Sequence, residues 1–158
     1  RAEFVKAKKD YPERETTEQD GTPYAMSRQL FFAPSGVPCV APPWGQLTAV
    51  NIDTGEIAWR TPLGAIEGAP GSPNLGGPLT TSNGLVFIGA SVDPYIRAFD
   101  TKNGREVWKG TLPTSARSTP LLYTSASGRQ MIAIAAGGHD IKFSKIDTKL
   151  VVFALTPK

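Results

Sequence analysis

Side chains that could perform chemistry are few in this sequence and lie far apart. His139 is the only histidine and Cys39 the only cysteine, so the spacing of a zinc site is missing. A Ser-His-Asp triad is not predicted either, because no G-x-S-x-G elbow accompanies the single histidine. The carboxylates that a hard cation would require are scattered singly, at Asp53, Asp93, Asp100, Asp140 and Asp147. We therefore predict no metal site within this chain. Cys39, which has no partner for an internal disulfide, is predicted to be a small buried hydrophobic residue.

The remaining candidates each have a plain structural interpretation as well. A lone histidine such as His139 is more often a hydrogen-bonded structural residue than a functional one. Asp93 precedes Pro94 and could simply begin a turn. The segment Asn74 to Pro78 reads NLGGP and contains paired glycines, but neither the G-x-G-x-x-G spacing nor a following helix pattern accompanies it. A dinucleotide fingerprint is therefore not predicted.

The composition indicates short strands joined by turns. The chain has 16 glycines and 14 prolines, well above the usual combined share of about 12%, and apolar runs of strand length recur between them. None of these runs approaches the roughly 20 residues that span a bilayer. The net charge of +3 is spread out, apart from Lys6, Lys8 and Lys9, so a nucleic-acid partner is not expected.

A repeat organises the chain from residue 49 onward. The pattern A-x-[N/D]-x-x-x-G-x-x-x-W occurs twice, 49 residues apart, and ends at Trp59 and at Trp108. Self-similarity of this length is typical of propeller blades. We expect the Asn or Asp to begin a turn by accepting a backbone N–H two residues on, the glycine to adopt positive φ, and the Trp to fill the space between neighbouring sheets. A third partial copy, LVVFALTPK, predicts a last strand with Ala154 in the alanine position.

The strands between the copies predict an all-β, partial β-propeller of about two four-stranded blades plus a closing strand. We expect three regions: a charged arm over 1–20, an irregular Pro- and aromatic-rich insertion over 21–46, and C-terminal propeller blades over 47–158. The chain begins at Arg1 rather than at a methionine, so we expect it to be part of a longer protein. Sheets that lack neighbours leave apolar faces exposed, and the fragment is therefore expected to self-associate.

Four segments together resemble one family. They are GTPYAMSRQLFFAPSGVPCVAPPWGQLTAV, GSPNLGGPLTTSNGLVFIGA, YIRAFDTKNGREVWKGTLP and IAIAAGGH. They are similar to the C-terminal part of dehydrogenases that use pyrroloquinoline quinone (PQQ), in the membrane-bound glucose/quinate/shikimate group. The repeat looks like the tryptophan-docking motif of their eight-bladed propeller.

The resemblance implies an enzyme. The full-length parent would oxidise a sugar or polyol hydroxyl, with glucose as the default and quinate or shikimate as alternatives, and would pass electrons to a membrane quinone. PQQ and Ca²⁺ would be bound by the full-length parent, and this fragment alone would bind neither, because most of their ligands belong to the remaining propeller blades. The parent would be periplasmic and membrane-associated through an N-terminal part missing from this chain.

The resemblance also implies site residues. Asp93 and His139 occupy catalytic-site positions, and Asn74, Gly76 and Gly77 occupy positions that approach PQQ. One departure follows His139, where relatives often have a Gly-rich loop and this chain has DIKFSKIDTK. The competing hypothesis is a non-catalytic PQQ-like propeller that serves as a scaffold for protein binding. Such a scaffold has no need of the PYAMSRQLFFAPSGVPC insertion or of the AAGGH segment.

Overall fold

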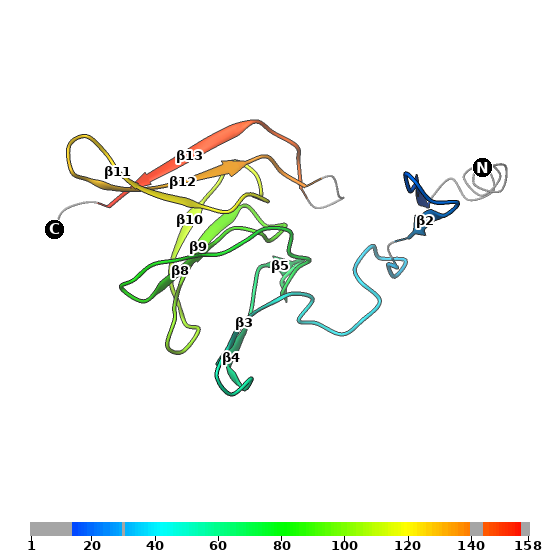
Figure 1. Ribbon diagram of the computed structural model, residues 1–158, viewed down its shortest axis with the longest axis horizontal. Coiled ribbons are helices and arrows are strands. Elements are labelled where there is room, and N and C mark those ends of the chain that lie inside the picture. Colours follow the sequence, from blue (N-terminus) through cyan, green and yellow to red (C-terminus); the bar gives the residue numbers. More distant parts are fainter. Residues whose placement is uncertain (1–13, 30, 140–143, 156–158) are drawn as a thin grey trace. The chain divides into compact units, whose positions relative to one another are not determined.

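The computed structural model describes residues 14–29, 31–139 and 144–155 (Figure 1). The chain divides into two compact units, Arg1–Cys39 and Val40–Lys158. The regular secondary structure of the described part consists of β-strands. That part contains no helix that could cross a membrane. The predicted all-β class is confirmed. The predicted region boundaries at 20/21 and 46/47 stay a prediction, and Lys6, Lys8 and Lys9 lie outside the described residues.

The first unit contains one small hairpin. Strands β1 (Glu15–Glu18) and β2 (Ala25–Arg28) pair antiparallel, and the Arg28 and Glu15 side chains form an exposed ion pair at 2.5 Å. Cys39 is exposed, so its predicted burial is wrong. Its backbone N–H donates to the Phe31 carbonyl at 3.4 Å, and its side chain lies outside the core clusters.

The second unit contains eleven short strands. They are β3 (Gln46–Val50), β4 (Ile57–Pro62), β5 (Ala65–Ile66), β6 (Ala69–Pro70), β7 (Leu79–Thr80), β8 (Leu85–Ile88), β9 (Tyr95–Asp100), β10 (Glu106–Thr111), β11 (Leu121–Thr124), β12 (Gln130–Ala136) and β13 (Lys149–Ala154). The order β10-β9-β8-β7 makes a four-stranded antiparallel sheet, and β11-β12-β13 makes a three-stranded one. The pairs β3-β4 and β5-β6 are separate hairpins.

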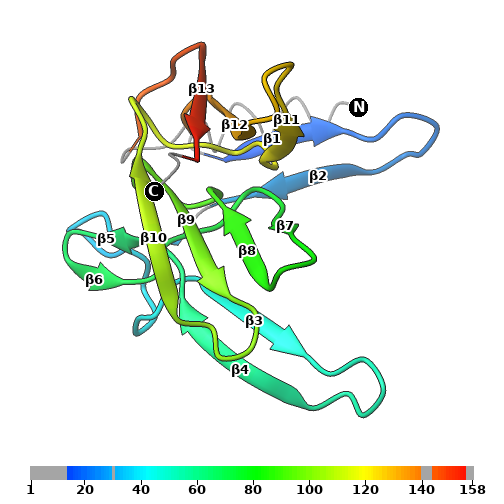
Figure 2. The same cartoon turned by 90° about the vertical axis from the view of Figure 1, so that its left-hand side faces the viewer.

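The four-stranded sheet lies between the three-stranded sheet and the β3–β4 hairpin, as both ribbon views show (Figures 1 and 2). One core cluster joins it to the three-stranded sheet and includes Ile96, Leu112 and Ile134. A second cluster, Leu63, Ile88, Ala90 and Phe99, joins it to the hairpin side. Strand β9 is therefore buried along both faces, which explains its almost unbroken run of buried residues.

The two repeat turns adopt the predicted geometry. The Asn51 side-chain oxygen accepts the Asp53 N–H at 2.9 Å, and the Asp100 side chain accepts the Lys102 N–H at 2.8 Å. Gly55 and Gly104 follow with φ of 74° and 69°, a conformation that glycine adopts without a Cβ clash. The same chemistry therefore closes both the β3–β4 and the β9–β10 hairpins.

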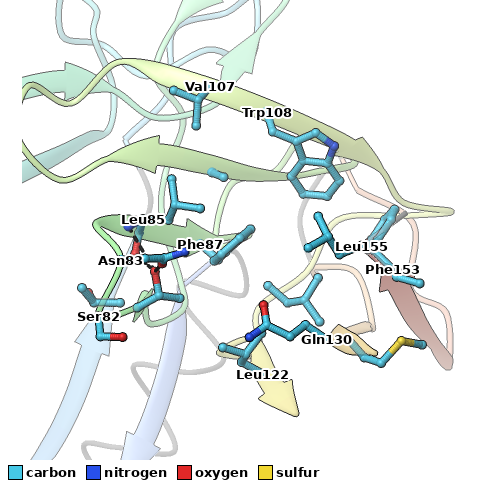
Figure 3. A pocket seen from close by; sticks show the side chains of 16 residues that line it. Ser82, Asn83, Leu85, Phe87, Val107, Trp108, Leu122, Gln130, Phe153 and Leu155 are labelled. Carbon is cyan, nitrogen blue, oxygen red and sulfur yellow. Dashed lines mark hydrogen bonds between the residues drawn. The ribbon is translucent and has the colours of Figure 1, made fainter. Parts of the chain in front are cut away.

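The repeated tryptophans connect neighbouring sheets. The Trp59 indole N–H, from β4, donates to the Thr101 carbonyl in the β9–β10 turn at 2.8 Å. Trp108, from β10, contacts Phe87 of its own sheet and Phe153 of β13 edge-to-face, with centroid separations of 6.3 and 5.2 Å (Figure 3). These contacts agree with the predicted position of each Trp between sheets.

The third copy is less complete than the first two. The predicted last strand is β13, and it pairs with β12 as a member of the three-stranded sheet. Ala98 is buried in the alanine position of the second copy, whereas Ala154 is exposed in the third. Ala154 lies at the end of β13, which is an edge strand of the three-stranded sheet in the described residues.

Candidate functional site

A sharp turn follows strand β8 and forms the centre of the candidate site. Ala90 is fully buried and has a φ of 57°, which costs a non-glycine residue about 1–2 kcal/mol. The Ser91 N–H donates to the Gly89 carbonyl at 2.6 Å, and the Ala90 carbonyl accepts the Leu75 N–H at 2.9 Å. We call residues 89–91 the Ala90 turn.

The NLGGP segment packs closely against this turn. A Cβ on Gly76 would lie 2.7 Å from the Arg117 carbonyl oxygen and 3.2 Å from the Ala90 Cβ. A Cβ on Gly77 would lie 2.6 Å from the Thr119 hydroxyl. The glycines thus allow the backbone to approach both neighbouring segments. The buried Oδ1 of Asn74 has no hydrogen-bond partner in the described residues.

His139 reaches the site through a glycine turn at the end of β12. Gly138 has a φ of 75° and donates its N–H to the Ser115 carbonyl at 2.8 Å. A Cβ on Gly138 would collide with the Lys145 carbonyl, so glycine is required there. The turn places the His139 side chain, only 1% exposed, beside Ser115.

Two serines hold the His139 ring and backbone. The Ser115 hydroxyl lies 2.6 Å from Nδ1 of His139 and also contacts the Ser144 hydroxyl. The His139 N–H donates to the Ser144 Oγ at 2.9 Å. The other ring nitrogen, Nε2, is buried and forms no hydrogen bond of regular geometry in the described residues, and the Ala90 backbone lies within weak hydrogen-bonding reach of the ring.

The surroundings favour the neutral form of His139. Burial lowers the pKa of its imidazole below the ordinary 6.5, and the positive charge of Arg117 lowers it further. The nearby Ala90 carbonyl acts in the opposite direction and only partly offsets the two. At pH 7 the ring is therefore neutral and carries its single proton on one of the two nitrogens.

Asp93 belongs to a separate ion-pair cluster. Its carboxylate accepts two bonds from the Arg97 guanidinium, at 2.5 and 2.9 Å, and one from the Ser91 hydroxyl at 2.5 Å. Glu106 lies 3.1 Å from the other side of Arg97. Burial by itself would lower the pKa of Arg97, but the bonds and charges of Asp93 and Glu106 raise it overall. Asp93 therefore has a full set of structural partners, and through Ser91 it braces the Ala90 turn.

The structure places three of the predicted residues against the Ala90 turn. Gly76 and His139 lie beside Ala90, and Asp93 accepts the Ser91 hydroxyl while Arg97 engages both of its oxygens. Gly77 packs on Thr119 instead, and the Asn74 amide nitrogen lies near Gly45. Sequence reasoning missed three neighbours of His139, namely Ser115, Arg117 and Ser144. The run TSARST at 114–119 contains Ser115 and Arg117, but the Ser115 contact spans 24 residues, and Ser144 follows His139 by five residues in a segment without a motif.

The structure also has a groove, which lies away from the Ala90 turn. This apolar groove of about 900 Å³ opens beside Trp108, and its walls include Phe87 and Phe153 (Figure 3). Its lining contains no histidine, aspartate or glutamate. The described residues also contain no group of three or more metal-ligating side chains. The groove thus offers apolar surface and little chemistry.

Sheets that stack face to face through repeated turn and tryptophan contacts define part of a β-propeller. A solved structure has the same arrangement: the quinohemoprotein alcohol dehydrogenase from Comamonas testosteroni, with a TM-score of 0.52 and 27% identity over 66% of this chain and 14% of that one.

Comparison of the sequences identifies the family. The profile described as the PQQ-containing glucose/ethanol/alcohol dehydrogenase β-propeller domain matches residues 1–132. The chain belongs to this family. It is 42% identical to the probable quinate dehydrogenase (quinone) of Xanthomonas campestris pv. juglandis over 75% of its length and 17% of the relative's. It is 34% identical to the quinoprotein glucose dehydrogenase of Escherichia coli K12 over 87% of its length and 19% of the relative's. The chain thus spans about a fifth of the length of these relatives.

Proposed function

We propose that the protein containing this chain is a PQQ-dependent dehydrogenase that oxidises a sugar or polyol hydroxyl. Family membership supports this proposal, as do the names of the two relatives, one acting on quinate and one on glucose. The higher identity to the quinate relative makes quinate or shikimate as strong a candidate as glucose. The word quinone in that relative's name supports a quinone as electron acceptor, and we further propose a periplasmic, membrane-associated protein that binds Ca²⁺ beside PQQ.

One observation in this chain carries the proposal. The buried Nε2 of His139 and Oδ1 of Asn74, both without partners in the described residues, belong to the segments packed on the Ala90 turn. Unpaired buried polar atoms cost about 1–3 kcal/mol each, and a bound polar molecule would remove that cost. PQQ is a flat o-quinone with three carboxylates, and the closely packed glycines, the His139 imidazole and the Arg117 charge fit part of its edge.

The roles of the individual residues follow from this fit. When bound, PQQ supplies the two-electron acceptor, and the protein's part is to bind and orient it. Gly76 and Gly77 would let the backbone approach the ring, while Asn74 and His139 would supply hydrogen bonds. For Asp93 we retain a role near the cofactor. Because Arg97 already binds its carboxylate, Asp93 would act by holding Ser91, and with it the Ala90 turn, in place.

We also propose that the remaining propeller blades cover the apolar faces left open here. The three-stranded sheet exposes Leu121 and Leu150 by 62% and 72%, and the groove beside Trp108 adds to this surface. Exposed patches of this kind favour association. The 158-residue chain alone should therefore self-associate. A single monomeric species in light scattering, with cooperative melting, would contradict this.

The activity test uses the full-length protein. After reconstitution with PQQ and Ca²⁺, dye reduction is measured with glucose, quinate, shikimate and a panel of polyols. Turnover of one of them, reduced at least tenfold in His139→Ala and unchanged in Ser125→Ala at the distant β11–β12 turn, would support the proposal. If no substrate reacts and no PQQ binds, the non-catalytic scaffold becomes the better description.

A further inference from the structure

The contacts around His139 form a closed ring of hydrogen bonds. The His139 N–H donates to the Ser144 Oγ, the two serine hydroxyls bond to each other, and the Ser115 Oγ bonds to Nδ1. Each serine has a single proton to donate. If Ser144 donates to Ser115 and Ser115 donates to Nδ1, every donor in the ring meets an acceptor inside it.

The opposite direction is less favourable. A proton on Nδ1 would donate to Ser115, whose own proton would turn to Ser144. The Ser144 Oγ would then accept from both Ser115 and the His139 N–H, and its own proton would have no acceptor among the described side chains and backbone. Hydrogen bonds that run in one direction around a chain also strengthen one another. The network therefore favours an unprotonated Nδ1.

We propose that Ser115 and Ser144 are positioning residues that keep the His139 proton on Nε2, so that Nε2–H donates to an oxygen atom of the bound cofactor. The inference rests on the proposed function. It adds to that function by naming Nε2 of His139 as the hydrogen-bond donor and the two serine hydroxyls as the groups that keep the proton there. A quinone or carboxylate oxygen fits this site, since Nε2 is buried, has only the Ala90 backbone within weak hydrogen-bonding reach, and lies near the positive Arg117. The lowered pKa of His139 supports the inference, because only a neutral ring has two alternative tautomers.

The test measures PQQ affinity of the full-length apoprotein, with Ca²⁺ present, by fluorescence titration. Ser115→Ala and Ser144→Ala should each weaken binding about fivefold, which is about 1 kcal/mol at 1.4 kcal/mol per tenfold. Because either change breaks the same ring of hydrogen bonds, the double variant should bind PQQ nearly as tightly as the single variant with the lower affinity. Ser118→Ala is the matched control: its hydroxyl also makes two hydrogen bonds, to the Ala135 carbonyl at 3.1 Å and N–H at 3.0 Å, and its affinity should be unchanged.

A spectroscopic measurement separates positioning from a merely structural role. With ¹⁵N-labelled histidine, the signals missing from His139→Gln identify His139. They should show the proton on Nε2 in the wild-type protein and a mixture of tautomers in Ser115→Ala. A proton on Nδ1, or fully additive effects of the two serine changes, would overturn the proposal. Unchanged PQQ affinity in His139→Gln would instead refute the proposed placement of the cofactor. Normal affinity in both serine variants with weakened His139→Gln would refute only the positioning role.

Discussion

Replacing Gly104 with alanine is expected to destabilise the protein far more than the same change at Gly55. The two glycines occupy the same position of the repeat, with φ of 69° and 74°. They differ in their surroundings: a Cβ on Gly55 meets nothing within 4 Å, whereas one on Gly104 would lie 2.4, 2.7 and 2.9 Å from three atoms of the Trp59 ring. Comparing the two variants therefore distinguishes the cost of backbone strain from the cost of a clash between neighbouring sheets.

The magnitudes follow from these environments. Positive φ costs an alanine about 1 kcal/mol at either position. At Gly104 the Trp59 indole must also move, which adds about 1–3 kcal/mol of overpacking. If the indole shifts, its hydrogen bond to the Thr101 carbonyl is lost as well, for about 1 kcal/mol more. We expect roughly 1 kcal/mol for Gly55→Ala and roughly 3–5 kcal/mol for Gly104→Ala.

The assay compares melting temperatures and urea midpoints of the full-length protein and its variants. Trp59→Ala serves as the background in which the clash is gone, so adding Gly104→Ala there should cost only about the 1 kcal/mol of backbone strain. Equal losses for Gly55→Ala and Gly104→Ala in the wild-type background would refute the reasoning. They would mean that Trp59 does not pack on the β9–β10 turn.

Three further predictions concern the ion pair, the histidine and the second tryptophan. Arg97→Met should lower stability by about 3 kcal/mol, because Asp93 stays buried without its partner, and adding Asp93→Asn should restore part of the loss in the same melting assay. The free energy of unfolding should fall as pH drops below 6.5, since the lowered pKa of His139 lets the unfolded chain bind the proton first. His139→Gln should make the free energy of unfolding depend less steeply on pH. An unchanged pH dependence would refute the assignment of this effect to His139. Trp108→Ala should cost about 2–3 kcal/mol by removing both ring contacts, whereas Val107→Ala, which removes a smaller and 44% exposed side chain, should cost less than 1 kcal/mol.

The sequence predicted the hairpins because their signals are local. Asn51 and Asp100 each bond to a backbone amide two residues on, and Gly55 and Gly104 adopt positive φ in the same turns. Turns of this kind depend on few neighbouring residues, so the repeat pattern alone is enough to predict them. The Trp contacts were also predictable in kind, because a large indole after each turn needs a neighbouring sheet.

The rest depends on contacts between distant segments. Cys39 was predicted to be a small buried residue, yet it is exposed. Asp93 reads as a free carboxylate before a proline, yet Arg97 and Ser91 occupy both of its oxygens. Ser115 is an ordinary serine until the Gly138 turn brings His139 beside it. No spacing rule connects residues 24 positions apart across two strands.

The distribution of local costs supports the proposed dehydrogenase over the proposed scaffold. In the described residues three buried side-chain atoms lack hydrogen bonds and two non-glycine residues have positive φ; Asn74, His139 and Ala90 account for three of these five features. Each costs about 1–3 kcal/mol. The β9–β10 turn makes a comparable reversal with a glycine and a satisfied aspartate, so the fold can turn without such costs. A repeat that only holds its neighbours gains nothing by gathering strain and unpaired atoms at one point, whereas a site that binds a polar cofactor does, because the ligand supplies the missing partners.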